Sequence, residues 1–321
     1  MPINIARFQY KDRVQWGVVS EYGVTPIPGD YATTGDLIVS LSLEALKQVG
    51  GDAVALHEIK LLSPVTRNQQ FVCQGANYRQ HMIESGVDPD TKHFNMIFTK
   101  ARSCIVPADS QVVIPDHVQL FDYEIELGLV LRKPITGKID ITEAELPNYV
   151  AGLVVVNDYS ARDVQLSQTQ FYKGKSYRTF GPVGPWLCLL EAEDFAYLNE
   201  LQLTLCVNDE VRQDDSTKNL VYDPVETLNE LSGVQDFAGG DLIATGTPAG
   251  CALSIPSPEK QKAAAHLSPA ERWKLFMQMQ LERPQYLKPG QVVTSHIRSN
   301  DGVIDLGIQK NLVVKDSNLS I

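Results

Sequence analysis

Residues 120–133, LFDYEIELGLVLRK, carry the sharpest signal in this chain of 321 residues. The stretch is typical of a buried strand, yet it places Asp122, Glu124 and Glu126 at alternate positions, whose side chains point to one face. The opposite face is apolar: Tyr123, Ile125, Leu127 and Leu129. Three like charges on a half-buried face repel one another and are poorly solvated. The sequence therefore predicts a positive charge beside this face.

Strand signals dominate the chain from Phe71 onward, and helical pieces are few. The runs include FVCQGAN, MIFTKA, QVVIPD, VAGLVVVND, LQLTLCVND and IDLGIQKNLVV. No repeat at a fixed period interrupts them. This pattern predicts a β-rich α+β fold.

Residues 1–65 differ from the rest, with short strand-like runs and one helical segment, LEALKQVG, that ends in a glycine. The following LLSPVTRNQQ is polar and contains a proline, as a boundary would. We expect a small N-terminal domain over residues 1–65 and a larger domain over 66–321.

One segment near the C-terminus predicts a capped helix, HLSPAERWKLFMQMQLERPQ. Ser268 and Glu271 form a capping box, Pro269 occupies the first helical position, and Pro284 ends the run. Four residues share one face: Trp273, Phe276, Met277 and Leu281. This stripe favours a surface helix packed on the core, with a lid or a subunit contact as the alternative.

The overall charge and the lengths of the apolar runs limit which partners and which compartment the protein can have. A formal net charge of −11, with no run rich in lysine and arginine, argues against nucleic acid and favours a small-molecule partner. No apolar run approaches the ~20 residues of a membrane helix, and the first residues lack a signal-peptide core. We expect a cytoplasmic protein. Its five scattered cysteines predict reduced, structural thiols.

The acidic strand is a candidate metal site. Glu124 and Glu126 offer oxygen ligands from one direction, and Asp158, at the end of the apolar run in VVVNDYSARD, is a candidate third ligand. Hard divalent cations prefer such oxygen donors. The alternative is a solvated strand face, since acidic residues are mostly exposed.

Two further segments carry candidate catalytic groups. In GANYRQHMIESG, His81 and Glu84 lie three apart on a short helix, where a carboxylate can orient an imidazole as a general base. A surface pair is the alternative. In FYKGKSYRTFGPVGPW, a lysine can face a developing oxyanion. The glycines of FAGGDLIATGTPAG lack the ending of a P-loop, and no G-x-S-x-G motif occurs.

Together, these pieces resemble the fumarylacetoacetate hydrolase family from about residue 71 to 250, and again near LKPGQVV. The anchors stand in the family's order: GANYRQHMIE, FTKARS, DYEIELGLVL, NDYSARDVQ, GKSYRTFGPVGPW and GGDLIATGTPAG. The resemblance implies a mixed β-sandwich roll, usually a homodimer, with Mg²⁺ (or Mn²⁺ or Ca²⁺) held by Glu124, Glu126 and Asp158. Asp122 would then hydrogen-bond beside the site rather than bind the ion.

The resemblance also implies residue roles. His81 and Glu84 would activate water on a mobile lid, and Lys175 would face the reacting oxygen. Three residues would hold the substrate or the shape of the site: Arg162, Gln165 and Thr247. For Arg162, a structural pair with Asp163 is the alternative.

Two departures from the family pattern bear on the substrate. Arg178 stands where many relatives have an acidic residue, and the helical segment at about residues 251–286 is longer than the usual link. That segment is expected to reshape either the pocket mouth or the dimer contact.

The implied activity is metal-dependent hydrolysis of a C–C bond in a 2-oxo or 1,3-dioxo acid, such as an acylpyruvate or a fumarylacetoacetate-like substrate. One alternative uses the same site as a 2-oxo diacid decarboxylase or keto–enol isomerase, of the oxaloacetate decarboxylase or 2-hydroxyhepta-2,4-diene-1,7-dioate isomerase type. The presence of both His81 and Glu84 favours hydrolysis. The other alternative is a metal- or ligand-binding protein without turnover.

Overall fold

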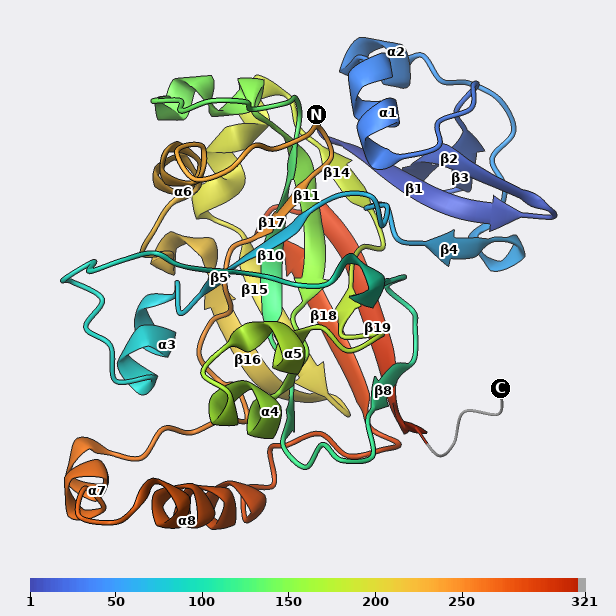
Figure 1. The fold of residues 1–321 in the computed structure, drawn as a ribbon. Coiled ribbons are helices and arrows are strands. Elements are labelled where there is room, and N and C mark those ends of the chain that lie inside the picture. The colour runs from blue at the N-terminus through green and yellow to red at the C-terminus, as the bar shows by residue number, and fades with distance from the viewer. Residues whose placement is uncertain (317–321) are drawn as a thin grey trace.

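The computed structural model describes residues 1–316. Its largest element is a ten-stranded mixed sheet, which runs through the middle of the molecule (Figure 1). The strand order is β3 (Gly23–Pro26), β2 (Arg13–Ser20), β1 (Ile3–Tyr10), β14 (Leu187–Leu189), β11 (Val150–Asn157), β10 (Ile125–Leu131), β17 (Leu242–Ala244), β5 (Phe71–Gly75) and β6 (Met96–Thr99), with β4 (Lys60–Leu62) also paired to β1.

A second, five-stranded sheet packs against the centre of the first, where β15 contacts β10 and β18 and β19 contact β11. Its order is β16 (Glu210–Ser216), β15 (Gln202–Val207), β18 (Val292–Arg298), β19 (Asp305–Lys315) and β8 (Val112–Ile114). Two short pairs complete the strands: β9 (Phe121–Asp122) with β12 (Ser160–Ala161), and β7 (Ile105–Val106) with β13 (Gly181–Pro182). The predicted β-rich α+β fold is confirmed.

Short helices surround the two sheets (Figure 1). The α-helices are α1 (Thr34–Ser40), α2 (Leu43–Lys47), α3 (Arg79–Glu84), α4 (Arg162–Ser167), α5 (Phe171–Lys175), α6 (Pro224–Leu231), α7 (Pro258–Ala263) and α8 (Pro269–Leu281). The 3₁₀ helices span Leu56–Glu58, Arg102–Cys104, Glu143–Asn148, Ala192–Asn199 and Thr217–Asn219. Among the described residues, no helix is long and apolar enough to cross a membrane.

Strands β10 and β11 form the centre of the core, because every residue of both is buried. Strands buried on both faces have continuous rather than alternating apolar sequences. Gly128 allows their close approach, since a Cβ at this position would lie 2.7 Å from Val154 Cγ2. The register places Ile125 opposite Asn157, so the start of β10 adjoins the end of β11.

The strand predicted over residues 120–133 is divided in two. Phe121 and Asp122 pair with β12, whereas Ile125 begins β10. Between them, the Glu124 backbone N–H donates to Asn157 Oδ1 at 3.0 Å, and its carbonyl accepts from the Asp158 N–H at 2.8 Å. The single alternating strand was therefore a wrong expectation: the acidic stretch changes partners at residues 123–124.

The N-terminal segment, with β1–β4, α1 and α2, lies at one corner of the molecule (Figure 1). Its strand β1 pairs with β14, Ile3 opposite Leu189 and Ile5 opposite Leu187. The large sheet thus continues across the boundary expected near residue 65. A separate domain over residues 1–65 stays a prediction.

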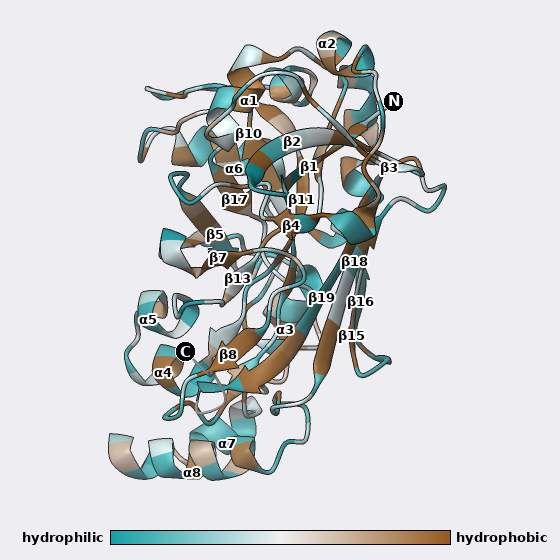
Figure 2. Ribbon diagram, turned by 90° about the vertical axis from the view of Figure 1, so that its right-hand side faces the viewer, coloured by the Kyte–Doolittle hydropathy of each residue, from teal (hydrophilic) through white to brown (hydrophobic). Residues whose placement is uncertain are grey.

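Helices α7 and α8 lie at the end of the molecule opposite α1 and α2 (Figure 2). The predicted capping box of Ser268 and Glu271 is present at the start of α8. Trp273 and Phe276 stack with ring centroids 5.5 Å apart, and Phe276 packs against the core. Leu281, however, is 54% exposed and does not belong to the packed stripe.

Candidate metal centre and active site

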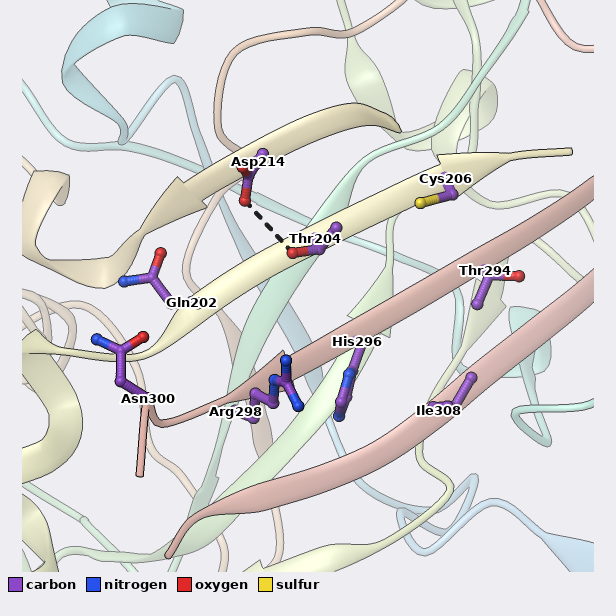
Figure 3. A pocket seen from close by; sticks show the side chains of 9 residues that line it. All are labelled: Gln202, Thr204, Cys206, Asp214, Thr294, His296, Arg298, Asn300 and Ile308. Carbon is purple, nitrogen blue, oxygen red and sulfur yellow. Dashed lines mark hydrogen bonds between the residues drawn. The ribbon is translucent and has the colours of Figure 1, made fainter. Parts of the chain in front are cut away.

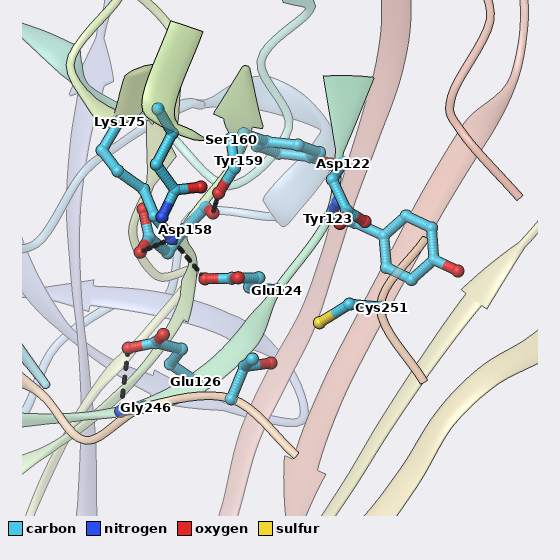
Figure 4. A network of polar contacts seen from close by, with 12 residues as sticks. Asp122, Tyr123, Glu124, Glu126, Asp158, Tyr159, Ser160, Lys175, Gly246 and Cys251 are labelled. Atoms are coloured by element: carbon cyan, nitrogen blue, oxygen red, sulfur yellow. Dashed lines mark hydrogen bonds and ion pairs between the residues drawn. The ribbon is translucent and has the colours of Figure 1, made fainter. Parts of the chain in front are cut away.

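Three buried carboxylates meet where the two central strands adjoin. Each of Glu124, Glu126 and Asp158 offers one oxygen atom, and these atoms lie within 4.8 Å of one another (Figure 4). Glu126 belongs to β10, Glu124 precedes it, and Asp158 follows β11. Because the start of β10 pairs with the end of β11, the three residues meet despite a separation of more than thirty positions. The structure thus brings together the three predicted metal ligands.

Two lysines contact the Asp158 carboxylate, one at each oxygen. Lys175 Nζ, from the end of α5, donates to Asp158 Oδ2 at 2.6 Å and to Glu124 Oε2 at 2.5 Å. The fully buried Lys100 forms an ion pair with Asp158 Oδ1 and donates to the Phe180 carbonyl at 3.0 Å. Lys100 was not predicted as a site residue, although it lies within the FTKARS anchor. Its position directly after a strand-like run was the available signal.

Arg162 links the acidic residues on the other side. Its Nε donates to Asp122 Oδ2 at 2.8 Å, its Nη2 pairs with Glu124 Oε1, and its Nη1 donates to Gln165 Oε1 at 2.9 Å. Asp163 instead accepts the Gln119 backbone N–H at 2.9 Å. The alternative pair of Arg162 with Asp163 is therefore not the arrangement found.

Asp122 lies beside the three-carboxylate cluster and joins it to the segment at residues 251–286. Besides Arg162, it accepts the backbone N–H groups of Ala252 at 2.7 Å and Leu253 at 3.0 Å. Leu253 also lines the cavity that contains Lys175. Asp122 thus hydrogen-bonds beside the site, as expected, and fixes the start of the long segment there.

The electrostatics of the cluster favour a further cation. Burial alone would raise the pKa of Glu124, but the charges of Arg162 and Lys175 outweigh burial and lower this pKa to about 2. Burial and the charges of Asp158 and Glu124 raise the pKa of Glu126 well above its ordinary value. The hydrogen bond described for the Glu126 side chain comes from the Gly246 backbone N–H, at 3.0 Å (Figure 4). A divalent cation would neutralise this carboxylate, and the all-oxygen donor set suits Mg²⁺, Mn²⁺ or Ca²⁺.

A cavity of about 210 Å³ opens onto the cluster. Seven predicted site residues line it: His81, Glu124, Glu126, Arg162, Gln165, Lys175 and Thr247. Thr247 Oγ1 donates to the Ile125 carbonyl at 2.9 Å and accepts from Gln213 Nε2 at 2.9 Å, so this hydroxyl supports the start of β10.

The structure describes no hydrogen bond between the side chains of His81 and Glu84. His81 faces the cavity, and burial lowers the pKa of its imidazole, which favours the neutral form. Glu84 is exposed, and the side-chain hydrogen bond described for it comes from Gln80 Nε2, at 3.5 Å. The dyad stays a prediction, and so does the role of His81 as a general base.

A larger hollow of about 420 Å³ lies on the five-stranded sheet (Figure 3). Its lining is polar, with Thr204 Oγ1 donating to Asp214 Oδ1 at 3.4 Å and with Arg298 and His296 on the adjacent strand. No residue of the three-carboxylate cluster lines this hollow. The candidate chemistry therefore lies in the smaller cavity.

A buried cluster of three carboxylates, joined to two lysines where β10 and β11 adjoin, can hold a divalent metal ion and defines the class of site. Residues 70–314 match the family model of the fumarylacetoacetate (FAA) hydrolase C-terminal domain. The chain belongs to the fumarylacetoacetate hydrolase family, and the predicted resemblance is confirmed.

Named relatives in this family include tautomerases. The chain is 32% identical over 216 residues to oxaloacetate tautomerase YisK of Bacillus subtilis, covering 66% of this chain and 69% of that protein. It is 37% identical over 195 residues to the human mitochondrial oxaloacetate tautomerase FAHD2A, covering 60% of each chain.

Solved structures share the whole fold. The fumarylacetoacetate hydrolase of Exiguobacterium antarcticum superposes with a TM-score of 0.74 at 27% identity, covering 98% of this chain and 99% of that one. A probable 2-hydroxyhepta-2,4-diene-1,7-dioate isomerase of Mycobacterium abscessus gives 0.72 at 27% identity, with the same coverage. The fold is thus shared by proteins named for hydrolysis and for isomerisation.

Proposed function

We propose that the protein is a metal-dependent keto–enol tautomerase or isomerase of 2-oxo acids. One observation carries this proposal: the Lys175 ammonium lies on the Glu124 and Asp158 carboxylates in the cavity that Glu126 also lines. Such a site suits a reaction in which negative charge develops on the C2 oxygen of a 2-oxo acid, next to the carboxylate of the substrate. The oxaloacetate tautomerases among the relatives support the same reaction type.

Glu124, Glu126 and Asp158 would hold the ion, with Mg²⁺ proposed first and Mn²⁺ or Ca²⁺ as alternatives. When bound, the ion supplies Lewis-acid stabilisation of an enolate oxygen. Lys100 pairs with Asp158, and Arg162, which lines the cavity, pairs with Glu124, so both cations keep the proposed ligands in place. Residues outside a metal's ligand shell commonly orient the ligands in this way.

The proton transfers fall to two residues of the chain. Burial opposes the charge of Lys175, but Asp158 and Glu124 outweigh burial and raise the pKa of this ammonium. Lys175 therefore stabilises the oxygen at C2 as a charged donor and shares a proton with it. Neutral His81 takes a proton from C3. One proton passes from C3 to His81 and one from Lys175 to the oxygen at C2, and exchange with solvent then restores both residues, so the keto acid becomes its enol without net gain or loss of protons.

Hydrolysis of a C–C bond is the second candidate, and neutral His81 favours it. Here His81 takes a proton from water, and the hydroxide oxygen bonds to the distal carbonyl carbon. The C3–C4 bond then breaks, its electron pair passes to C3, and a proton restores the methyl group of the released 2-oxo acid. The exposed position of Glu84 places this candidate second, since no hydrogen bond from His81 to Glu84 is described among the residues of the structure.

Proton NMR in D₂O with Mg²⁺ separates the candidates on oxaloacetate and acetylpyruvate. Enzyme-dependent exchange of deuterium into C3, with the carbon chain intact, supports the tautomerase. Release of pyruvate and acetate from acetylpyruvate identifies the hydrolase, and release of CO₂ from oxaloacetate identifies a decarboxylase. If the protein catalyses none of these reactions, with or without chelator, it is a ligand-binding protein without turnover.

The homodimer stays part of the proposal, because the family usually assembles in this way. Light scattering after gel filtration distinguishes a particle of about 71 kDa from a monomer of 35.6 kDa.

A further inference from the structure

A second cavity adjoins the candidate active site. Its volume is about 340 Å³, compared with about 210 Å³ for the first. The two share four lining residues: Gly75, Ala76, Val87 and Met96. The first cavity alone is smaller than the ~300–1,000 Å³ of typical ligand sites, whereas the two together fall within that range. A ligand bound at Lys175 can therefore extend past Met96 into the second cavity.

The second cavity differs in chemistry from the first. Its apolar walls come from Met82, Val87, Phe94 and Met96. Val87 is 39% exposed and Phe94 68% exposed, so large apolar side chains face solvent at its mouth. Among the described residues, no lysine or arginine lines this cavity, whereas Asp88 does.

The nearest cations on the surrounding segment are already engaged. Lys92 Nζ lies 2.8 Å from Glu226 Oε1, and Arg79 Nη1 donates to Asp90 Oδ1 at 2.9 Å. A second carboxylate reaching this cavity would lose hydration beside Asp88, and the described lining offers His93 but no lysine or arginine to replace it. Burying an unpaired carboxylate is strongly unfavourable.

Met96 is placed to control passage between the cavities. It ends the pairing of β6 with β5 opposite Gly75, and a Cβ on residue 75 would lie 2.7 Å from the Met96 sulfur. Glycine at position 75 therefore leaves room for a flexible thioether that can repack around a chain.

We propose that the substrate is a 2-oxo acid whose far end is an apolar chain, and that the second cavity selects it over 2-oxo diacids of equal length. This proposal rests on the proposed function. It places the 2-oxo acid end of the substrate in the cavity lined by Lys175 and Arg162. The apolar end then lies against Met82, Val87, Phe94 and Met96.

The test compares matched acids. We expect kcat/KM to rise about fourfold for each added methylene from acetylpyruvate to hexanoylpyruvate. The diacid 2,4-dioxononanedioate, equal in length to hexanoylpyruvate, should react at least 100-fold less efficiently. Reactions are followed at pH 8 by the change in enol absorbance with Mg²⁺ present.

A variant with an added positive charge tests whether the preference for the monoacid can be reversed. V87K places an ammonium in the shared wall and should raise kcat/KM for the diacid at least tenfold while lowering it for hexanoylpyruvate. V234K, at a position that is 73% exposed and lines neither cavity, is the control and should change neither value.

A binding measurement tests the selection between monoacid and diacid independently of the proposed reaction. The unreactive 2-hydroxynonanoate and 2-hydroxynonanedioate are compared by calorimetry. Tighter binding of the monoacid supports the apolar cavity even if no 2-oxo acid reacts, in which case only the proposed reaction fails. Equal or tighter binding of the diacid, or its preferred turnover, overturns the selection and leaves the reaction standing.

Discussion

Lys175 Nζ lies 2.6 Å from Asp158 Oδ2, so an ammonium shares an oxygen-rich cluster with the carboxylates proposed to bind a metal. K175M removes this charge. In chelator, Glu124 and Asp158 then repel one another, and we expect the variant to lose about 3–5 kcal/mol of unfolding free energy. Mn²⁺ should restore more stability to the variant than to the wild type, measured by thermal unfolding.

K173M is the matched control, because Lys173 is exposed on the same helix. It should leave unfolding and its metal response unchanged. Equal responses of K175M and wild type to Mn²⁺ would mean that the ion and Lys175 do not share ligands.

Lys100 is predicted to be structural for the metal centre. Its side chain is fully buried against Asp158, so K100M leaves a buried carboxylate with one partner fewer and should cost about 3–5 kcal/mol in urea unfolding. K92M breaks the exposed pair with Glu226 and should cost at most about 1 kcal/mol. Similar losses for the two variants would contradict the role of Lys100.

Glu126 is predicted to bind metal and, when no metal is bound, to lower the unfolding free energy of the protein in its charged form. Burial raises its pKa above the ordinary value of 4.5, so in chelator the unfolding free energy should decrease as pH rises above about 4.5. E126Q should reduce this decrease and weaken Mn²⁺ binding at least about 100-fold, as measured by calorimetry. E210Q, on an exposed side chain, is the control.

The pH dependence of kcat/KM is predicted to report His81. Burial lowers the pKa of this imidazole below its ordinary value of 6.5, and only the neutral form accepts a proton. Activity should therefore fall towards acid with a midpoint below 6.5. H81N should lose most activity and this acid limb with it. A limb that persists in H81N would assign the titration to another group.

Asp122 is predicted to hold the start of the segment at residues 251–286. D122N replaces an acceptor of two backbone N–H groups and of Arg162 with an amide, so the segment should detach more readily. Limited proteolysis should cut the variant faster within residues 251–286. D163N removes the charge from a residue one position after Arg162 and should retain the wild-type cleavage rate.

Glu124 and Glu126 could be predicted as a pair of oxygen donors because they stand two residues apart, and Asp158 could be proposed as the third because it follows a buried strand. The family resemblance, rather than the spacing, implied that the three meet, since their contact depends on the pairing of β10 with β11. Lys100 could not be assigned in this way. Its burial depends on contacts with Asp158, Tyr159 and Phe180, all more than fifty residues away.

The division of the acidic stretch depends on partners that the stretch does not contain. Phe121 and Asp122 take β12 as their neighbour, while the residues from Ile125 onward take β11 and β17. Hydrophobic pattern gives no sign of such a change of partner. The exposed position of Leu281 could not be predicted either, because helical spacing shows which residues share a face but not which of them the core covers.

The pairing of β1 with β14 has a consequence for shortened versions of the protein. A fragment beginning at residue 66 would retain the family match, yet it would uncover the backbone donors and acceptors of Leu187, Cys188 and Leu189. Uncovered strand edges recruit other chains and promote aggregation. A fragment beginning at residue 66 is therefore expected to aggregate more readily than the full chain, because β1 no longer covers this strand edge.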